Sequence, residues 1–388
     1  MTLSISFRFS PVLVSLALLA GSGAAPIAAQ AQSYTLTNLG TLPGSTLSVG
    51  AGVNNSGQVA GYAYTTSVPG HAFLSGANGG PLADLGTLPG GTYSSGAGVN
   101  NSGQVAGRAD TASGYSHAFL SGLNGGPLKD LGALGGTYSE GFGVNSSGQV
   151  TGYAYTASLQ DRAFLSGPNG GTLTALGLLP GANGSFGTGV NDSGQVTGYS
   201  GTVGNIQFHA FLSEANGGTL TDLGTLGGTI SYGRGVNNSG QVVGESFTAG
   251  DGSIHAFLFG GGLLTDLGTL PGDADSYGTG INDSGQAVGV SVAASGSAHA
   301  FLFSGGTLLD LNSLVAPGSG VTLANANGIS NTGFITGTGR DSNGQNFAFL
   351  LTPNAPVPEA STTVSLGLLL MLGIGGMVVA ACRKHQAA

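Results

Sequence analysis

The amino-acid sequence predicts an all-β protein built from one repeated unit, and three observations lead to this prediction. Glycine accounts for 76 of the 388 residues, and because glycine destabilises helices, long helices are not expected in the body of the chain. Hydrophobic residues reach 40% and charged residues only 6%, which argues against a coiled coil or a charged disordered chain. The third observation is that three short motifs recur in a fixed order.

These motifs mark seven units. An Asn-x-Ser-Gly-Gln motif recurs at spacings of 46, 45, 46, 46, 45 and 48 residues, with a degenerate last copy. It starts at Asn54, Asn100, Asn145, Asn191, Asn237, Asn282 and Ser330. A His-Ala-Phe-Leu motif starts at His71, His117, His209, His255 and His299, with Arg162 and Phe347 in the other two places. A Leu-Gly-x-Leu motif starts at Leu39, Leu85, Leu131, Leu176, Leu223 and Leu267, and its seventh copy is Leu311-Asn312-Ser313-Leu314.

Each unit is expected to form four short strands. In one copy the first strand is 82–86, the second ends at 98–100, the third is 104–108 and the fourth is 117–120. The Asn-Ser-Gly and Gly-Gly segments between them are typical of tight turns. A four-stranded repeat of about 40–50 residues is typical of a propeller blade. The sequence therefore predicts a seven-bladed β-propeller over residues 32–354, with an open β-solenoid as the alternative.

The chain begins and ends out of phase with this unit. A lone first strand is expected at 35–40, and the last unit ends after a fourth strand at 347–350. If the blades are built in the order second, third, fourth, first strand, the last blade lacks its outer strand. We expect the N-terminal strand to complete that blade, which would close the ring and cover an exposed sheet edge.

The His-Ala-Phe tripeptide and the repetition of the whole unit resemble the HAF extracellular repeat family, and the resemblance covers residues 34–351. It implies an extracellular bacterial protein and says little about activity. The N-terminus agrees, because Arg8, an apolar run at 12–20 and the small-x-small sequence Ala29-Gln30-Ala31 are typical of a signal peptide. We expect cleavage between Ala31 and Gln32, which makes residues 1–31 the signal peptide.

A second tripartite signal is expected at the C-terminus. A linker at 355–362 contains Val357, Pro358, Glu359 and Ala360. An uncharged apolar run at 363–381 follows, and at 1.5 Å per residue it spans about 28 Å as a transmembrane helix. Arg383 and Lys384, in a basic cytoplasmic tail at 382–388, would stop transfer.

This segment resembles the PEP-CTERM sorting signal of Gram-negative bacteria, with Ala360 in place of the second proline of the motif. The resemblance implies export through the inner membrane, transient anchoring, and cleavage by an exosortase-type protease before release or attachment at the cell surface. A permanent C-terminal anchor is the alternative.

Charge and cysteine content exclude further classes. Residues 32–354 contain five Lys/Arg and sixteen Asp/Glu, a difference of −11, and the basic residues do not cluster, so a nucleic-acid surface is not expected. The single cysteine, Cys382, lies outside these residues, so no disulfide stabilises the predicted propeller.

The repeated polar residues are expected to have structural roles. The five motif histidines should lie on the third strand from the axis, too far apart for one metal ion, and each should form the same local hydrogen bond. The aspartates of the first strands should cap turns, and the seven motif phenylalanines should pack between blades. The aspartates are Asp84, Asp130, Asp222, Asp266 and Asp310, with Asn38 and Ala175 in the other places.

Catalysis would require groups that break the repeat. The candidate carboxylates are Asp110, Glu140, Asp161, Glu214, Glu245, Asp251, Asp273, Asp275 and Asp341. Asp273 and Asp275 are two apart in a segment that we expect to be a connecting loop, yet no base accompanies them at a telling spacing. Aromatic residues recur in the first-to-second connection, where we expect packing over the blade more than sugar stacking: Tyr93, Tyr138, Phe186, Tyr232 and Tyr277.

We therefore predict no catalytic, metal or cofactor residues. The expected function is a non-catalytic cell-surface or matrix protein that binds exopolysaccharide or another surface partner. A propeller hydrolase or lyase, and a matrix protein without a specific ligand, remain alternatives. Because strand direction alternates, the tight hairpins should share one face and the variable connections the other. We expect any ligand on the variable face, where Asp251 and Asp341 lie.

Overall fold

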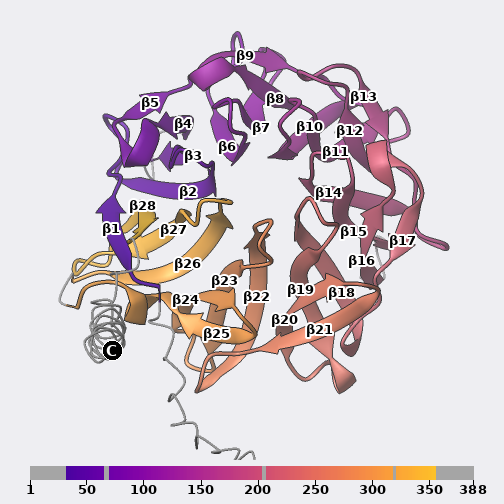
Figure 1. The fold of residues 1–388 in the computed structure, drawn as a ribbon. Helices are drawn as coiled ribbons and strands as arrows, with labels where there is room; N and C mark the ends of the chain where they lie inside the picture. The colour runs from indigo at the N-terminus through magenta and orange to yellow at the C-terminus, as the bar shows by residue number, and fades with distance from the viewer. Residues whose placement is uncertain (1–31, 65–69, 203–206, 318–319, 355–388) are drawn as a thin grey trace, which may run out of the picture. The chain divides into compact units, whose positions relative to one another are not determined.

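Seven four-stranded antiparallel sheets form a ring (Figure 1). The computed structural model describes residues 32–64, 70–202, 207–317 and 320–354, so the predicted signal peptide, sorting motif, transmembrane span and basic tail lie outside the described residues. Within the described part of the chain, no helix is both long and apolar enough to cross a membrane. The all-β, seven-bladed prediction is confirmed.

Six blades run from the ring centre outwards in chain order, and the seventh has the N-terminal strand β1 as its outer strand; we number the blades 1 to 7. The inner strands are β2 (Leu47–Val53), β6 (Ser94–Val99), β10 (Gly135–Val144), β14 (Gly184–Val190), β18 (Gly227–Val236), β22 (Asp273–Ile281) and β26 (Thr322–Ile329). The second strands are β3 (Val59–Tyr64), β7 (Val105–Asp110), β11 (Val150–Thr156), β15 (Val196–Thr202), β19 (Val242–Thr248), β23 (Ala287–Ala293) and β27 (Ile335–Arg340).

The third strands contain the His-Ala-Phe-Leu motifs, and the outer strands are short. The third strands are β4 (His71–Ser75), β8 (Ser116–Gly122), β12 (Asp161–Ser166), β16 (Gln207–Ser213), β20 (Ile254–Gly260), β24 (Ala298–Ser304) and β28 (Asn346–Pro353). The outer strands are β5 (Leu82–Asp84), β9 (Gly126–Asp130), β13 (Leu173–Ala175), β17 (Leu220–Asp222), β21 (Leu263–Gly268), β25 (Thr307–Asp310) and β1 (Tyr34–Asn38).

The N-terminal strand closes the ring as predicted. Strand β1 pairs antiparallel with β28, with Tyr34 opposite Pro353 and Asn38 opposite Phe349, and β28 and β1 lie side by side in Figure 1. Tyr34 is 4% exposed and packs in the core of the last blade. This pairing joins the two ends of the described chain and leaves β28 without a free edge.

The repeated phenylalanine and glycine form one packing unit in each blade. All seven motif phenylalanines have no exposed surface, and each lies opposite the glycine of the Gln-Val-x-Gly segment on the second strand, as Phe73 lies opposite Gly61. A Cβ atom on Gly61 would lie 1.9 Å from the Val49 carbonyl oxygen and 2.8 Å from the Phe73 ring. Glycine at this position therefore lets the ring pack against the sheet, and the predicted role of phenylalanine in packing is confirmed.

A serine on the inner strand joins neighbouring blades. The Oγ of Ser94, in blade 2, accepts the N–H of Ala72 in blade 1 and donates to the Gly86 carbonyl oxygen. The same bond from the motif alanine to the serine of the next blade recurs at Ser139, Ser185, Ser231, Ser276 and Ser48. The last of these joins blade 7 to blade 1, so the bonds continue across the closure.

Candidate functional site

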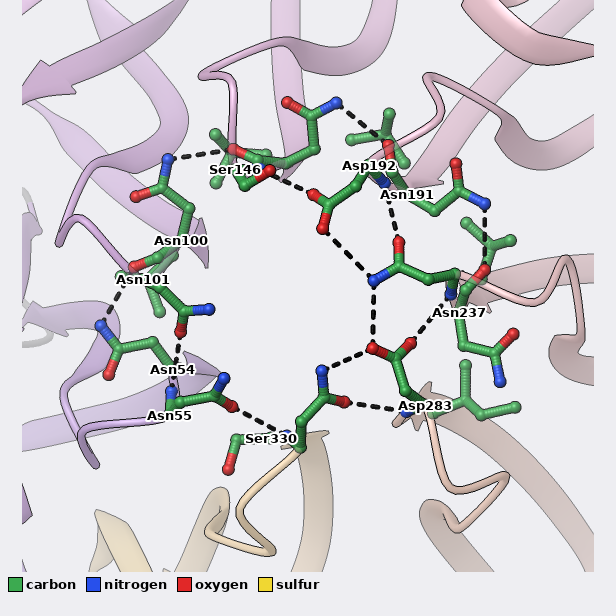
Figure 2. A pocket seen from close by; sticks show the side chains of 18 of the residues that line it. Asn54, Asn55, Asn100, Asn101, Ser146, Asn191, Asp192, Asn237, Asp283 and Ser330 are labelled. Carbon is green, nitrogen blue, oxygen red and sulfur yellow. Dashed lines mark hydrogen bonds between the residues drawn. The ribbon is translucent and has the colours of Figure 1, made fainter.

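The Asn-Ser-Gly hairpins gather around the axis at one face of the ring and form a polar pocket of about 170 Å³ (Figure 2). In six blades the first asparagine donates from Nδ2 to the backbone carbonyl oxygen of the equivalent residue in the next blade, at 3.0–3.2 Å. Its Oδ1 accepts backbone N–H groups of its own turn, as Asn237 does from Ser239 and Gln241. These asparagines are buried and link the blades.

A second set of polar side chains lies nearer the centre of the same pocket (Figure 2). The carboxylates of Asp192 and Asp283 flank Asn238, whose Nδ2 donates to both, at 3.3 and 3.0 Å. Asn331 also donates to Asp283. Within the described residues, no group of three or more His, Cys, Asp or Glu side chains is arranged to hold a metal ion. The polar groups of this pocket mainly bond one another and connect the blades.

The motif histidines lie on the third strand of each blade, as expected. In blades 1, 2, 4 and 5 the Nδ1 atom lies 2.8–2.9 Å from a carboxylate oxygen of the outer-strand aspartate, as in His71–Asp84. That aspartate also accepts the N–H of the glycine two residues later. The predicted turn cap is therefore present. In blades 3 and 7 both partners are replaced together, by Arg162 with Ala175 and by Phe347 with Asn38.

Blade 6 departs from the expected pattern, so the prediction of one identical histidine bond in every blade is wrong there. His299 contacts Asp273 on the inner strand, with 3.1 Å between Nδ1 and Oδ2. The outer-strand Asp310 instead accepts both the backbone N–H and the side-chain amide of Asn312. Asn312 replaces the usual glycine in the degenerate Leu-Gly-x-Leu copy, and its side chain donates an additional hydrogen bond to Oδ1 of the aspartate whose counterparts pair with histidine elsewhere.

The placement of Asp273 and Asp275 also corrects the sequence analysis. Both lie on strand β22 and not in a connecting loop. The two carboxylates have different partners, because Asp273 contacts His299 and Asp275 accepts the N–H of Ile254 in blade 5. The sequence analysis did not connect Asp273 with His299, because His299 lies 26 residues further along the chain. The degenerate motif at 311–314 was the one sequence feature that set the histidine of this blade apart from the others.

A chain of aromatic rings lies on blades 3 to 5, on the first two strands except for one ring on the third strand of blade 4, and we call it the aromatic surface. Neighbouring ring centroids are 4.8–5.7 Å apart, a distance typical of stacked or edge-on pairs. Its residues are half-buried. They are Tyr138, Tyr153, Tyr155, Phe186, Tyr199, Phe208 and Tyr232.

The aromatic surface extends toward the face with variable connections. Tyr155 lies one residue before the end of β11, and Phe208 is the second residue of β16, so both are next to the connection between second and third strands. Three of the predicted aromatic residues, Tyr138, Phe186 and Tyr232, join this surface. They pack on rings of their own and neighbouring blades, which agrees with the packing role that we expected.

Two arginine–glutamate pairs flank the aromatic rings. Arg108 donates to the Tyr138 hydroxyl at 2.9 Å and lies 3.5 Å from Glu140. Arg234 binds both carboxylate oxygens of Glu245 through Nε and lies over the Tyr199 and Tyr232 rings. Burial raises the pKa of the Glu245 carboxyl above its ordinary value, and the charge of Arg234 opposes this shift. Each pair is close to neutral in total, so the surface has little net charge.

Three of the remaining candidate carboxylates form local hydrogen bonds, and one of them, Asp110, accepts the Ser116 hydroxyl. Asp251 accepts the backbone N–H and the hydroxyl of Thr229. Asp341 accepts the N–H groups of Asn343 and Gln345 and so caps its own loop. Segments 65–69 and 203–206 of the variable connections lie outside the described residues.

Comparison with known proteins identifies the fold and no family. No family model and no curated protein matches the chain. The β-propeller domain of the Trilobed protease from Pyrococcus furiosus, described as having an open velcro topology, has a TM-score of 0.50 and 8% identity, covering 84% of this chain and 99% of that one. In contrast, β1 closes the ring here.

Two further structures are more distant or longer. A structure of prolyl endopeptidases has a TM-score of 0.50 and 10% identity, over 80% of this chain and 51% of that one. TolB from Acinetobacter baumannii has a TM-score of 0.43 and 10% identity, over 78% and 64% of the two chains. At such identities the two likenesses with a TM-score of 0.50 show the β-propeller fold alone and leave the activity open.

Proposed function

We propose that this chain is an exported, non-catalytic protein of the cell surface or extracellular matrix that binds exopolysaccharide or another surface glycan. The observation that supports this proposal is the aromatic surface on blades 3 to 5. Half-buried tyrosine and phenylalanine rings beside the partly exposed side chains of Arg108 and Arg234 offer both apolar faces and hydrogen-bonding groups to a sugar. Rigid strands position these side chains, and variable connections border them.

The proposal includes the delivery route that the sequence indicates. The signal peptide at 1–31 would direct export and then be removed. A PEP-CTERM-like signal with its apolar run at 363–381 would anchor the protein until an exosortase-type protease cleaves near Val357–Ala360. Intact-mass measurement of protein released into the medium tests this step. Released protein should lack Cys382, and its presence would contradict the processing proposal.

Binding is tested with a glycan array on residues 32–354, which comprise all seven blades, with and without calcium. The best hit is then measured against Tyr155→Ala and Phe208→Ala, which remove rings at the edge of the aromatic surface. Tyr115→Ala is the matched control, because Tyr115 is 50% exposed in a blade 2 connection. Replacing the two edge rings should weaken binding about tenfold or more. Equal binding by all three variants would refute this location.

A propeller-scaffold hydrolase or lyase is the second candidate, and the His299–Asp273 pair favours it over a purely structural role, because a histidine beside a buried carboxylate can exchange protons. Incubation of the array hit with the protein distinguishes the two. A binding protein leaves the glycan chain intact, whereas an enzyme shortens it.

A further inference from the structure

A cleft lies between blades 6 and 7. Its volume is about 410 Å³, within the range of small-molecule sites. It lies at the face with variable connections, because its walls include the connection before β24 and the last residue of β27, where the connection to β28 begins. The lining residues are Ser295, Gly296, Ser297, Ala298, His299, Thr322, Ala324 and Arg340.

One wall of the cleft holds an oriented histidine. The Asp273 side chain is only 4% exposed, whereas the aspartates that partner histidine in the other blades are 43–47% exposed. His299 itself is 36% exposed. Since Nδ1 is engaged by the buried carboxylate, the Nε2 edge of the ring is the part that can meet a ligand. No other blade has this arrangement among the described residues.

The opposite wall supplies a guanidinium group. The Nε of Arg340 donates to the side-chain oxygen of Asn346 at 3.3 Å, and within the described part of the chain Arg340 forms no ion pair. The nearest acid in sequence, Asp341, is engaged by its own loop. Arg108 and Arg234 differ in this respect, because each already faces a glutamate. A planar guanidinium without an acidic partner is suited to binding a carboxylate through two parallel hydrogen bonds.

The groups between these walls are small hydroxyls and methyls. Ser295, Ser297 and Thr322 can donate and accept hydrogen bonds, while Ala298 and Ala324 offer small apolar surfaces. We propose that this cleft binds one sugar acid, with its carboxylate on Arg340 and its hydroxyl groups on His299 and the serine and threonine hydroxyls. Asp273 is a positioning residue that holds the imidazole. The site is separate from the aromatic surface and does not depend on it.

The test is calorimetric titration of the full chain, in a detergent without a sugar headgroup, with three probes. Galacturonate should bind, its methyl ester should bind at least tenfold more weakly because it lacks the charge, and an oligogalacturonide distinguishes a free sugar acid from a residue within a polymer. Arg340→Gln should weaken galacturonate binding about tenfold or more, as expected for the loss of a charge-assisted pair. His299→Gln should weaken binding of both galacturonate and its ester.

Two control variants are matched to these changes. Arg162→Gln removes an arginine that occupies the histidine position of blade 3, and His71→Gln removes a histidine paired with an exposed aspartate. Both should bind galacturonate normally. The proposal is overturned if galacturonate and oligogalacturonide do not bind, if the methyl ester binds as tightly as the acid, or if Arg340→Gln and Arg162→Gln behave alike. Galacturonate binding by a protein with no hit for the aromatic surface would support this site and count against the proposed function.

Discussion

The glycine opposite each motif phenylalanine can be tested by a single methyl group. In blade 6, Gly289 pairs with Gly278 on the inner strand and with Phe301 on the third strand. A Cβ atom at position 289 would lie 2.0 Å from the Tyr277 carbonyl oxygen and 2.7 Å from the Phe301 ring. Both partners are constrained, the first by the sheet and the second by complete burial, so the Gly289→Ala variant must shift a strand.

Overpacking of a well-packed core costs about 1–3 kcal/mol in the free energy of unfolding. With a urea dependence of about 3 kcal/mol per molar, the unfolding midpoint should fall by about 0.3–1 M. Gly177→Ala is the matched control, because a Cβ atom there meets nothing within 4 Å and the backbone is outside the left-handed region. That variant should be unchanged or gain up to about 1 kcal/mol by restricting the unfolded chain.

The measurement is equilibrium urea unfolding followed by far-UV circular dichroism for the parent protein and the two variants. A Gly289→Ala midpoint equal to that of Gly177→Ala would refute the reasoning, because it would mean that the phenylalanine does not depend on close approach to the strand. A similar loss from the equivalent Gly61→Ala change would extend the result to blade 1, where the contacts are 1.9 and 2.8 Å.

Three further predictions concern closure, ionisation and the axial ring. Deletion of residues 34–42 removes β1 and exposes β28, so the variant should aggregate in light scattering; a soluble monomer with an unchanged melting temperature would contradict ring closure. Burial raises the pKa of Tyr34 to about 12, so part of the tyrosinate absorbance at 295 nm should appear only well above pH 10. The folded-state pKa of Tyr34 exceeds the unfolded value, so the contribution of its neutral, buried hydroxyl to stability is complete below pH 10 and is lost as the pH rises through about 12. Full titration of all tyrosines of the folded protein near pH 10 would argue against this raised pKa. Asn237→Ala removes side-chain bonds to its own turn and to Asn282 of the next blade, and should lower the free energy of unfolding by about 1–3 kcal/mol in the same urea experiment, a result that an unaltered midpoint would exclude.

Local sequence was sufficient to predict the repeat and its closure. Turn residues such as Asn-Ser-Gly act within a few positions of the chain, and a phenylalanine present in all seven copies has one structural role. The first and last strands could be matched because the last unit lacks one strand of its four, and the N-terminus provides one strand that belongs to no other unit. For the same reason the turn-capping role of aspartates such as Asp84 was predictable, since that bond spans two residues.

Contacts between distant residues were decided by the tertiary structure. The sequence alone predicts neither that the inner-strand serines bond to the preceding blade nor that rings such as Tyr153 and Phe186 meet across a blade boundary, because these contacts depend on how one sheet is placed on the next. The same holds for His299, which contacts Asp273 and not Asp310, the aspartate that corresponds to the histidine partner in other blades. A bond that joins residues on non-adjacent strands depends on strand register and on competition from neighbours such as Asn312, and those are properties of the assembled blade.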